Sequence, residues 1–130
     1  NLAIAETERL SEIPECAAIN LPDPGSSTNW ADPQSNRFWE TLSSLDLAAS
    51  FHGGGSQTRW FRGHTETPGL ASVSHAIAFP LDGMLSMGTL IFGNVLENFP
   101  KLRCSFLEGN AGWAPWWLAR MDDHAIGRQG

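Results

Sequence analysis

One stretch near the end of the chain, residues 101–124 (KLRCSFLEGNAGWAPWWLARMDDH), constrains the fold more than any other. It begins with closely spaced apolar residues, a pattern typical of a strand buried on both faces: Leu102, Cys104, Phe106 and Leu107. Glu108 follows this run, and Gly109 and Gly112 then predict a sharp turn with positive φ angles. Pro115 suits the first turn of a helix, and large residues recur around it at helical spacing: Trp113, Trp116, Trp117, Met121 and His124. The stretch therefore predicts a strand, a turn and a helix, with a carboxylate where α/β folds build their active sites.

The first half of the chain alternates between the same two kinds of element. Residues 1–13 have the pattern of the end of an amphipathic helix, and residues 16–21 that of a short buried strand. Residues 36–45 predict a helix with Asn36 as its N-cap, and residues 47–51 predict a further strand. The order helix, strand, helix, strand implies parallel βα units in an α/β fold.

The region before the opening stretch predicts helices. Residues 71–79 predict a short helix, and Pro80 opens a longer one that ends at about Asn98. One side of this longer helix is apolar: Leu81, Met84, Leu85, Ile91, Val95 and Leu96. Its glycines allow it to pack closely on a sheet. The polar segments 22–33 and 56–69 are predicted to be loops that shape a pocket.

Composition and charge exclude several classes of protein. The 130 residues suffice for one modest domain, and 42% of them are hydrophobic. A net charge of −6, from 8 basic and 14 acidic residues, argues against nucleic acid as a partner. Cys16 and Cys104 lie far apart and form no zinc-finger spacing. With no signal-peptide pattern and no run of about 18 apolar residues, we expect a chain of the reducing cytoplasm that does not span a membrane.

Residues with useful chemistry follow two of the predicted strands. His52 ends one strand and precedes Gly53, Gly54 and Gly55, which let a substrate or metal approach the backbone. Because parallel strands end at the same edge of a sheet, we expect His52, Glu108 and the loop after Leu21 to share a rim. Histidine can bind a metal or transfer protons near neutral pH, and glutamate can bind a metal, orient a water or act as a general base. We therefore predict a metal ligand at His52 and a catalytic carboxylate at Glu108.

Each of these residues also has a structural interpretation. His52 would then cap the strand end through a hydrogen bond, and Glu108 would form a salt bridge with a neighbouring Arg or Lys. A catalytic zinc also needs about three protein ligands, and the pattern offers one good histidine. Trp116 and Trp117 are expected in the core. The predicted substrate pocket comprises Trp113, Asn110 and His75.

Two segments of the chain resemble one known family. Residues 90–124 contain the run LIFGNVLENFPKLRCSFLEGNAGWAPWWLARMDDH, which resembles the amidohydrolase family related to aminocarboxymuconate semialdehyde decarboxylase. That family shows a Gly-Val-hydrophobic-Glu-Arg-Phe-Pro-Lys-Leu run, then Leu-Glu-Gly, then Gly-Trp-x-Pro-x-Trp-Leu-x-Arg-x-Asp. Residues 38–55, FWETLSSLDLAASFHGGG, resemble its fifth-strand unit, and the two motifs stand in the family's order and separation.

The resemblance implies a (β/α)8 TIM barrel with one divalent metal, zinc or alternatively manganese, at the carboxyl ends of the strands. It implies hydrolysis or non-oxidative decarboxylation of a small carboxylated compound, often aromatic or lactone-like, by a full-length protein that forms homodimers. By this resemblance His52 matches the metal-binding histidine of the fifth strand. Glu108 falls at the sixth-strand position, where many members carry a catalytic histidine.

The family's first-strand His-x-His and eighth-strand Asp have no counterpart in this chain. We therefore expect residues 1–130 to be one partial domain, from roughly the fourth strand to the helix after the sixth, with about three parallel strands and flanking helices. Alone it is expected to be marginally stable or to aggregate, and to be inactive, because sheet edges are left unpaired. The alternative is a non-catalytic α/β binding module derived from the same barrel.

Overall fold

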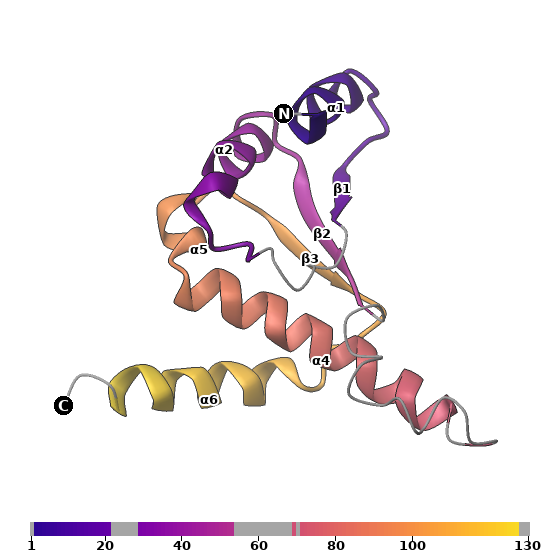
Figure 1. The fold of residues 1–130 in the computed structure, drawn as a ribbon, viewed down its shortest axis with the longest axis vertical. Coiled ribbons are helices and arrows are strands. Elements are labelled where there is room, and N and C mark those ends of the chain that lie inside the picture. The colour runs from indigo at the N-terminus through magenta and orange to yellow at the C-terminus, as the bar shows by residue number, and fades with distance from the viewer. Residues whose placement is uncertain (1, 22–28, 54–68, 70, 128–130) are drawn as a thin grey trace.

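In the computed structural model, the described residues are 2–21, 29–53, 69 and 71–127, and they form a parallel sheet with helices packed against it (Figure 1). In chain order the elements are α1 (Leu2–Ser11), β1 (Ala18–Leu21), the 3-10 helix η1 (Pro33–Ser35), α2 (Asn36–Ser44), β2 (Ala48–His52), α4 (Ala71–Phe92), α5 (Val95–Asn98), β3 (Cys104–Leu107) and α6 (Ala114–Gly127). The predicted α/β class, with parallel strands and flanking helices, is confirmed. Most of the two predicted pocket loops lies outside the described residues.

The three strands follow one another in space as they do in the chain. β2 pairs in parallel with β1 on one side and with β3 on the other, so that Phe51 is level with Leu21 and with Phe106. Right-handed connections between neighbouring parallel strands bring the intervening helices to one face of the sheet. Figure 1 accordingly shows α2, α4 and α5 together on one side of the strands.

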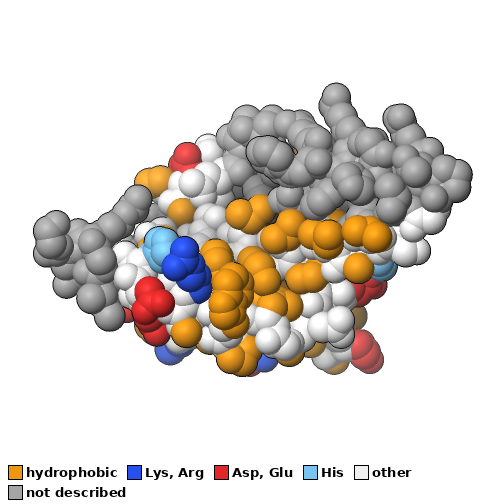
Figure 2. All heavy atoms as spheres, turned by 90° about the horizontal axis from the view of Figure 1, so that it is seen from below, with side chains coloured by type: hydrophobic (Ala, Val, Ile, Leu, Met, Phe, Trp, Pro, Cys, Tyr) orange, Lys and Arg blue, Asp and Glu red, His pale blue; other side chains and the backbone are white. Residues whose placement is uncertain are grey.

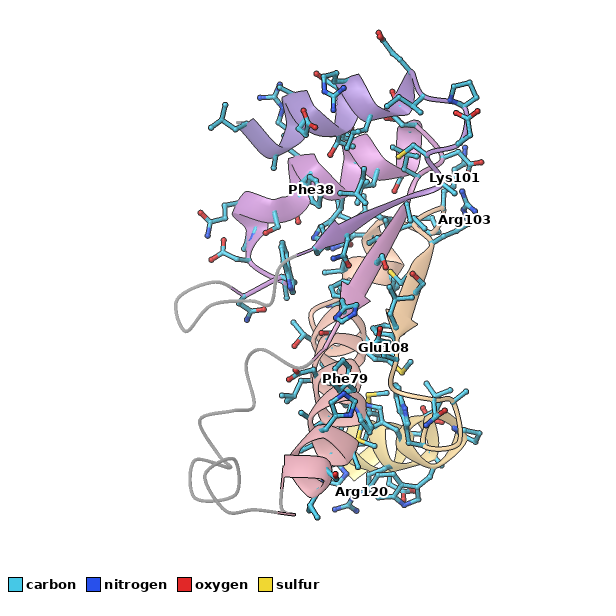
Figure 3. The ribbon with its side chains drawn as sticks, turned by 90° about the vertical axis from the view of Figure 1, so that its right-hand side faces the viewer. Phe38, Phe79, Lys101, Arg103, Glu108 and Arg120 are labelled. Atoms are coloured by element: carbon cyan, nitrogen blue, oxygen red, sulfur yellow. The ribbon has the colours of Figure 1, made fainter. Side chains whose placement is uncertain are left out.

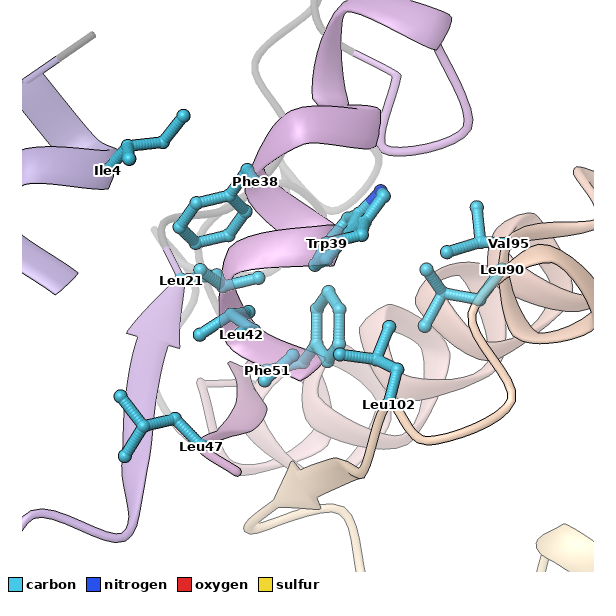
Figure 4. Close-up of a cluster of buried hydrophobic side chains, with 11 residues drawn as sticks. Ile4, Leu21, Phe38, Trp39, Leu42, Leu47, Phe51, Leu90, Val95 and Leu102 are labelled. Atoms are coloured by element: carbon cyan, nitrogen blue, oxygen red, sulfur yellow. The ribbon is translucent and has the colours of Figure 1, made fainter. Parts of the chain in front are cut away.

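The core lies between this face of the sheet and the helices (Figure 4). Its buried apolar residues come from every layer: Ile4, Leu21, Phe38, Trp39, Leu42, Leu47, Ala49, Phe51, Leu90, Val95 and Leu102. Phe51 stacks on Phe106 with ring centroids 5.4 Å apart, and the Trp39 indole N–H donates to the Trp30 carbonyl at 3.0 Å. These contacts join β2, β3 and α2 into one packed unit.

The opposite face of the sheet carries mainly small or polar side chains, together with Leu107. Ala48, Ser50 and His52 alternate with the helix-facing residues of β2, and Ser105 and Leu107 are level with Ser50 and His52 on β3. Leu107 is 40% exposed. The sequence predicts that the strand observed as β3 is buried on both faces. This prediction is wrong for the described part of the chain, because helices cover only one face of the sheet.

A single helix replaces the two that were predicted around Pro80. α4 runs through Pro80 and ends at Phe92, and Asn94 then takes a left-handed conformation (φ 57°) before α5 begins. Proline removes one backbone hydrogen bond from a helix interior, yet both halves of α4 remain aligned. A proline can therefore mark a helix interior as well as a helix start, and the end of α4 is set instead by the left-handed Asn94.

The side of α4 that faces the sheet is not the one that the apolar pattern predicts. The buried residues of α4 recur every fourth position and include two polar ones: Ala78, Asp82, Ser86 and Leu90. Leu85 and Phe92, by contrast, are 55% and 53% exposed. The expectation for Leu85 is thus wrong, because close packing against the strand ends selects the small and polar side of the helix.

The residues of α4 from His75 to Phe92 form one helix in the described part of the chain that is long and apolar enough to cross a membrane. Their mean hydropathy is 1.3, and 28% of them are buried inside the structure. Core helices of soluble proteins reach similar values, so this composition is weak support for a membrane span.

Candidate active site

His52 and Glu108 lie together at the carboxyl ends of neighbouring strands. His52 is the last residue of β2, and Glu108 directly follows β3. The His52 Nε2 atom lies 3.2 Å from the Glu108 Oε1 atom, and both side chains are partly open to solvent. Figure 3 shows Glu108 at this end of the sheet, whereas Lys101 and Arg103 lie at the other end. The predicted juxtaposition of the two residues is present, and the partner of Glu108 is a histidine rather than an Arg or Lys.

The hydrogen bonds of the His52 ring restrict its protonation. The Nδ1 atom lies 3.0 Å from the Gly53 carbonyl oxygen, which can only accept, so this nitrogen carries a hydrogen. In a neutral ring Nε2 then presents a lone pair to the Glu108 carboxylate, which also only accepts. The contact is favourable when a proton makes the ring a cation, or when a metal ion lies between the two atoms.

The backbone of Glu108 adopts an uncommon conformation. Glu108 has φ 61° and Asn110 has φ 54°, while Gly109 and Gly112, which were predicted to take the positive angles, do not. A glycine is needed at 109 for a different reason: a Cβ there would lie 3.3 Å from the Phe79 carbonyl oxygen and from the Pro80 Cα. A left-handed glutamate is strained, and such strain at a strand end is a recognised mark of functional sites.

One turn of α4 packs directly against both strand ends. A Cβ at Gly53 would lie 3.0 Å from the Phe79 Cα and 3.1 Å from its carbonyl oxygen. The Phe79 ring meets the His52 ring edge-on at 5.7 Å. Phe79 thus shields one side of His52, a role that the sequence analysis missed because an apolar residue in a helix carries no chemical signal.

The buried Asp82 was also missed. It lies one turn after the Phe79 segment, 5% exposed, with its Cβ 3.0 Å from where a Gly53 side chain would begin. A single carboxylate within a long apolar helix was the available signal, because charged residues are rarely buried without a partner. Asp82 thus places a second carboxylate close to the end of β2.

The three residues of the predicted substrate pocket are placed differently. His75 is exposed, and its ring packs at a tilt against the Phe79 ring with centroids 4.5 Å apart, while the Phe79 ring also contacts His52. Trp113 donates from Nε1 to the Gly109 carbonyl at 2.7 Å, and its ring lies against Gly83 of α4. Asn110 is exposed in the turn. Trp113 therefore fixes the turn that holds Glu108, and His75 and Asn110 are exposed to solvent.

Trp116, Trp117 and Cys104 lie outside the site. Trp116 is 60% exposed, which corrects its expected place in the core. Trp117 is partly buried and donates from Nε1 to the Met84 carbonyl at 3.0 Å. Burial raises the pKa of the Cys104 thiol to about 11, so it stays protonated and unreactive near neutral pH, as expected for a packing residue.

The site was tested for its fit to a metal ion. Two donors bound at ordinary distances to one tetrahedral zinc lie about 3.3 Å apart, close to the 3.2 Å between His52 Nε2 and Glu108 Oε1. The described residues contain no cluster of three or more His, Cys, Asp or Glu side chains that could hold a metal. The spacing of the pair thus fits two positions of a metal site, and the described residues do not supply the further ligands.

Two of the cavities formed by described residues lie away from His52 and Glu108. One, of about 430 Å³, lies between α1, β1 and α2, and the other, of about 360 Å³, lies between α4 and α6.

Comparisons with models of protein families, with curated proteins and with solved structures gave no match. The function of the chain therefore has to be inferred from its own residues and their geometry.

Proposed function

We propose that the chain is part of a metal-dependent enzyme of the amidohydrolase type, which hydrolyses or non-oxidatively decarboxylates a small carboxylated compound. The observation that carries the proposal is the 3.2 Å contact between His52 Nε2 and Glu108 Oε1 at the carboxyl ends of adjacent parallel strands. This is the end of a parallel sheet at which α/β enzymes place their reacting groups. The motif resemblance points to the same two residues.

The sheet supports a barrel as the full architecture. Parallel strands in sequential order, with helices on one face, are the repeating arrangement of a (β/α)8 barrel. The opposite face, with Ala48, Ser50 and Ser105, would then face the barrel interior. His52 would stand at the rim of that interior, where a substrate enters. The homodimer implied by the resemblance and the cytoplasmic location expected from the sequence belong to the same proposal.

His52 and Glu108 would hold the metal, zinc or manganese, through Nε2 and Oε1. When bound, such an ion supplies Lewis-acid chemistry, because it polarises a carboxylate or carbonyl and lowers the pKa of a bound water. The Gly53 carbonyl holds the His52 ring in the tautomer whose Nε2 lone pair is available for the ion.

Three features of the chain prepare Glu108 and His52 for this role. The left-handed turn directs the Glu108 carboxylate toward His52. The Trp113 indole fixes that turn through its hydrogen bond to Gly109. The Phe79 ring excludes water from one side of His52. A carboxylate held in this way can accept a proton from a water or orient the substrate.

Zinc titration by isothermal calorimetry tests the proposal. We expect His52→Ala and Glu108→Gln each to weaken zinc binding by about tenfold or more, because each removes a donor. Glu40→Gln, which changes an exposed carboxylate on α2, serves as the matched control and should bind zinc as the parent chain does. Equal zinc affinity of the parent chain and both site variants would refute the metal site.

The alternative function, a non-catalytic binding module of the same fold, is favoured by one observation. A protonated His52 satisfies both the Gly53 carbonyl and Glu108 without a metal, as a structural ion pair would. If the parent chain binds no zinc while Glu108→Gln lowers its stability, the pair is structural and the binding-module function is the better one.

A further inference from the structure

The cavity between α4 and α6 combines apolar walls with basic groups. Phe92, Trp117 and Met121 form the walls, and Arg120 and His124 complete the lining. Figure 2 shows the apolar side chains gathered into one exposed area, with an Arg and a His side by side at one end of it. Its volume of about 360 Å³ lies in the range of small-molecule sites.

The cavity walls are held in place by contacts within the two helices. The Trp117 Nε1 atom donates to the Met84 carbonyl at 3.0 Å, which fixes the indole against α4. A Cβ at Gly88 would lie 3.5 Å from the Trp117 ring, an ordinary van der Waals distance, so the indole packs against this part of α4. The cavity is thus built by packing between two helices rather than by a loop.

Charge selects the kind of molecule that the cavity suits. Its lining includes the Arg120 guanidinium and the His124 imidazole, and no carboxylate. Asp122 and Asp123 neighbour them in sequence and do not line the cavity, although Asp123, three residues after Arg120, projects from the same side of α6. In a chain with a net charge of −6, the Arg120 guanidinium gives this apolar cavity a cationic group.

We propose that this cavity binds a small apolar molecule that bears one carboxylate. The apolar part would lie against Phe92, Trp117 and Met121, and the carboxylate would pair with the planar guanidinium of Arg120. The His124 Nδ1 atom lies 3.0 Å from the Arg120 carbonyl oxygen, which holds the ring at the cavity wall, and the hydrogen bonds to the carboxylate would come from Arg120. The site shares no residue with the His52–Glu108 pair, so it stands apart from the proposed catalytic function.

A pair of matched probes tests the proposal: 3-phenylpropionate, which carries the carboxylate, and 3-phenylpropanol, which does not. Binding to the purified chain is followed by NMR, with the Trp117 indole N–H as the reporter in the cavity wall. We expect the acid to bind about tenfold more tightly than the alcohol, because a charge-assisted hydrogen bond is gained.

Substitutions then assign the effect to the cavity. Arg120→Gln should remove the preference for the acid while leaving the alcohol unchanged, and Arg37→Gln, at an exposed arginine of α2, should keep the preference. His52→Ala should also keep it, which separates this site from the proposed metal site. Equal binding of acid and alcohol, or the same loss in Arg37→Gln as in Arg120→Gln, would overturn the proposal. A Trp117 signal that neither probe moves would do so as well.

Discussion

Glycine at position 108 should give a more stable protein than alanine at the same position. Glu108 has φ 61°, a left-handed angle that costs a non-glycine residue roughly 1–2 kcal/mol. Alanine keeps that strain, whereas glycine relieves it. Glycine also lowers the free energy of unfolding by about 0.4–1 kcal/mol, because the unfolded chain has more conformational freedom with glycine than with alanine. Both variants lose the contact with His52, so this term cancels between them. The expected difference is about 1 kcal/mol in favour of glycine, or about 4 °C in Tm.

Urea unfolding of Glu108→Gly and Glu108→Ala, followed by tryptophan fluorescence, measures this difference. Glu40 provides the matched control because it is exposed within α2. There the order should reverse, with alanine about 1 kcal/mol more stable than glycine, as in any helix interior. If alanine is the more stable residue at 108 as well, the left-handed turn is not strained and the argument for stored strain at this site fails.

Two further predictions concern burial. Leu90→Ala should lower the free energy of unfolding by about 2–5 kcal/mol because Leu90 is fully buried. Leu85→Ala should lower it by no more than about 0.5 kcal/mol because that side chain is 55% exposed. Equal losses of the two variants in urea unfolding would contradict the observed orientation of α4. Cys104 should react slowly with iodoacetamide at pH 8 in the native chain and quickly in urea, as read by mass spectrometry, because burial raises its pKa to about 11. Because the folded-state pKa of Cys104 is raised above its ordinary value, the thiol's contribution to stability is complete below pH 9 and is lost as the pH rises from 9 to 11. Alkylation of the native chain as fast as alkylation in urea would refute the burial of this thiol.

Strain and close packing meet at the proposed catalytic residues. Glu108 is held in a costly backbone conformation, and Gly53 and Gly109 bring both strand ends against one turn of α4. Such an arrangement fixes the distance between His52 and Glu108 at the expense of stability, a trade that active sites commonly show. The Glu108→Gly variant therefore separates folding stability from metal binding. It should be more stable than Glu108→Ala, and it lacks the carboxylate that would bind the metal.

The sequence by itself determined the order of elements and the meeting of two key residues. Short apolar runs followed by helical periodicity identified β2, β3 and α6, and the parallel arrangement then placed His52 and Glu108 at one edge. These features are local in origin, because periodicity and turn residues act over a few neighbouring positions. One long-range feature was also predictable: the carboxyl ends of parallel strands lie at the same edge of a sheet. This was sufficient to predict that the ends of β2 and β3 lie together.

Only the tertiary structure decided which surfaces are buried and which backbone positions are strained. Whether α4 buries Leu85 or Asp82 depends on the shape of the strand ends against which the helix packs. The spacing of apolar residues along the helix contains no information about that shape. The left-handed conformations lie at Glu108 and Asn110 rather than at the glycines, and Gly109 instead lets the Phe79 carbonyl approach the backbone closely. Both outcomes arise from contacts between segments far apart in the chain, whose steric demands override the preferences of single residues.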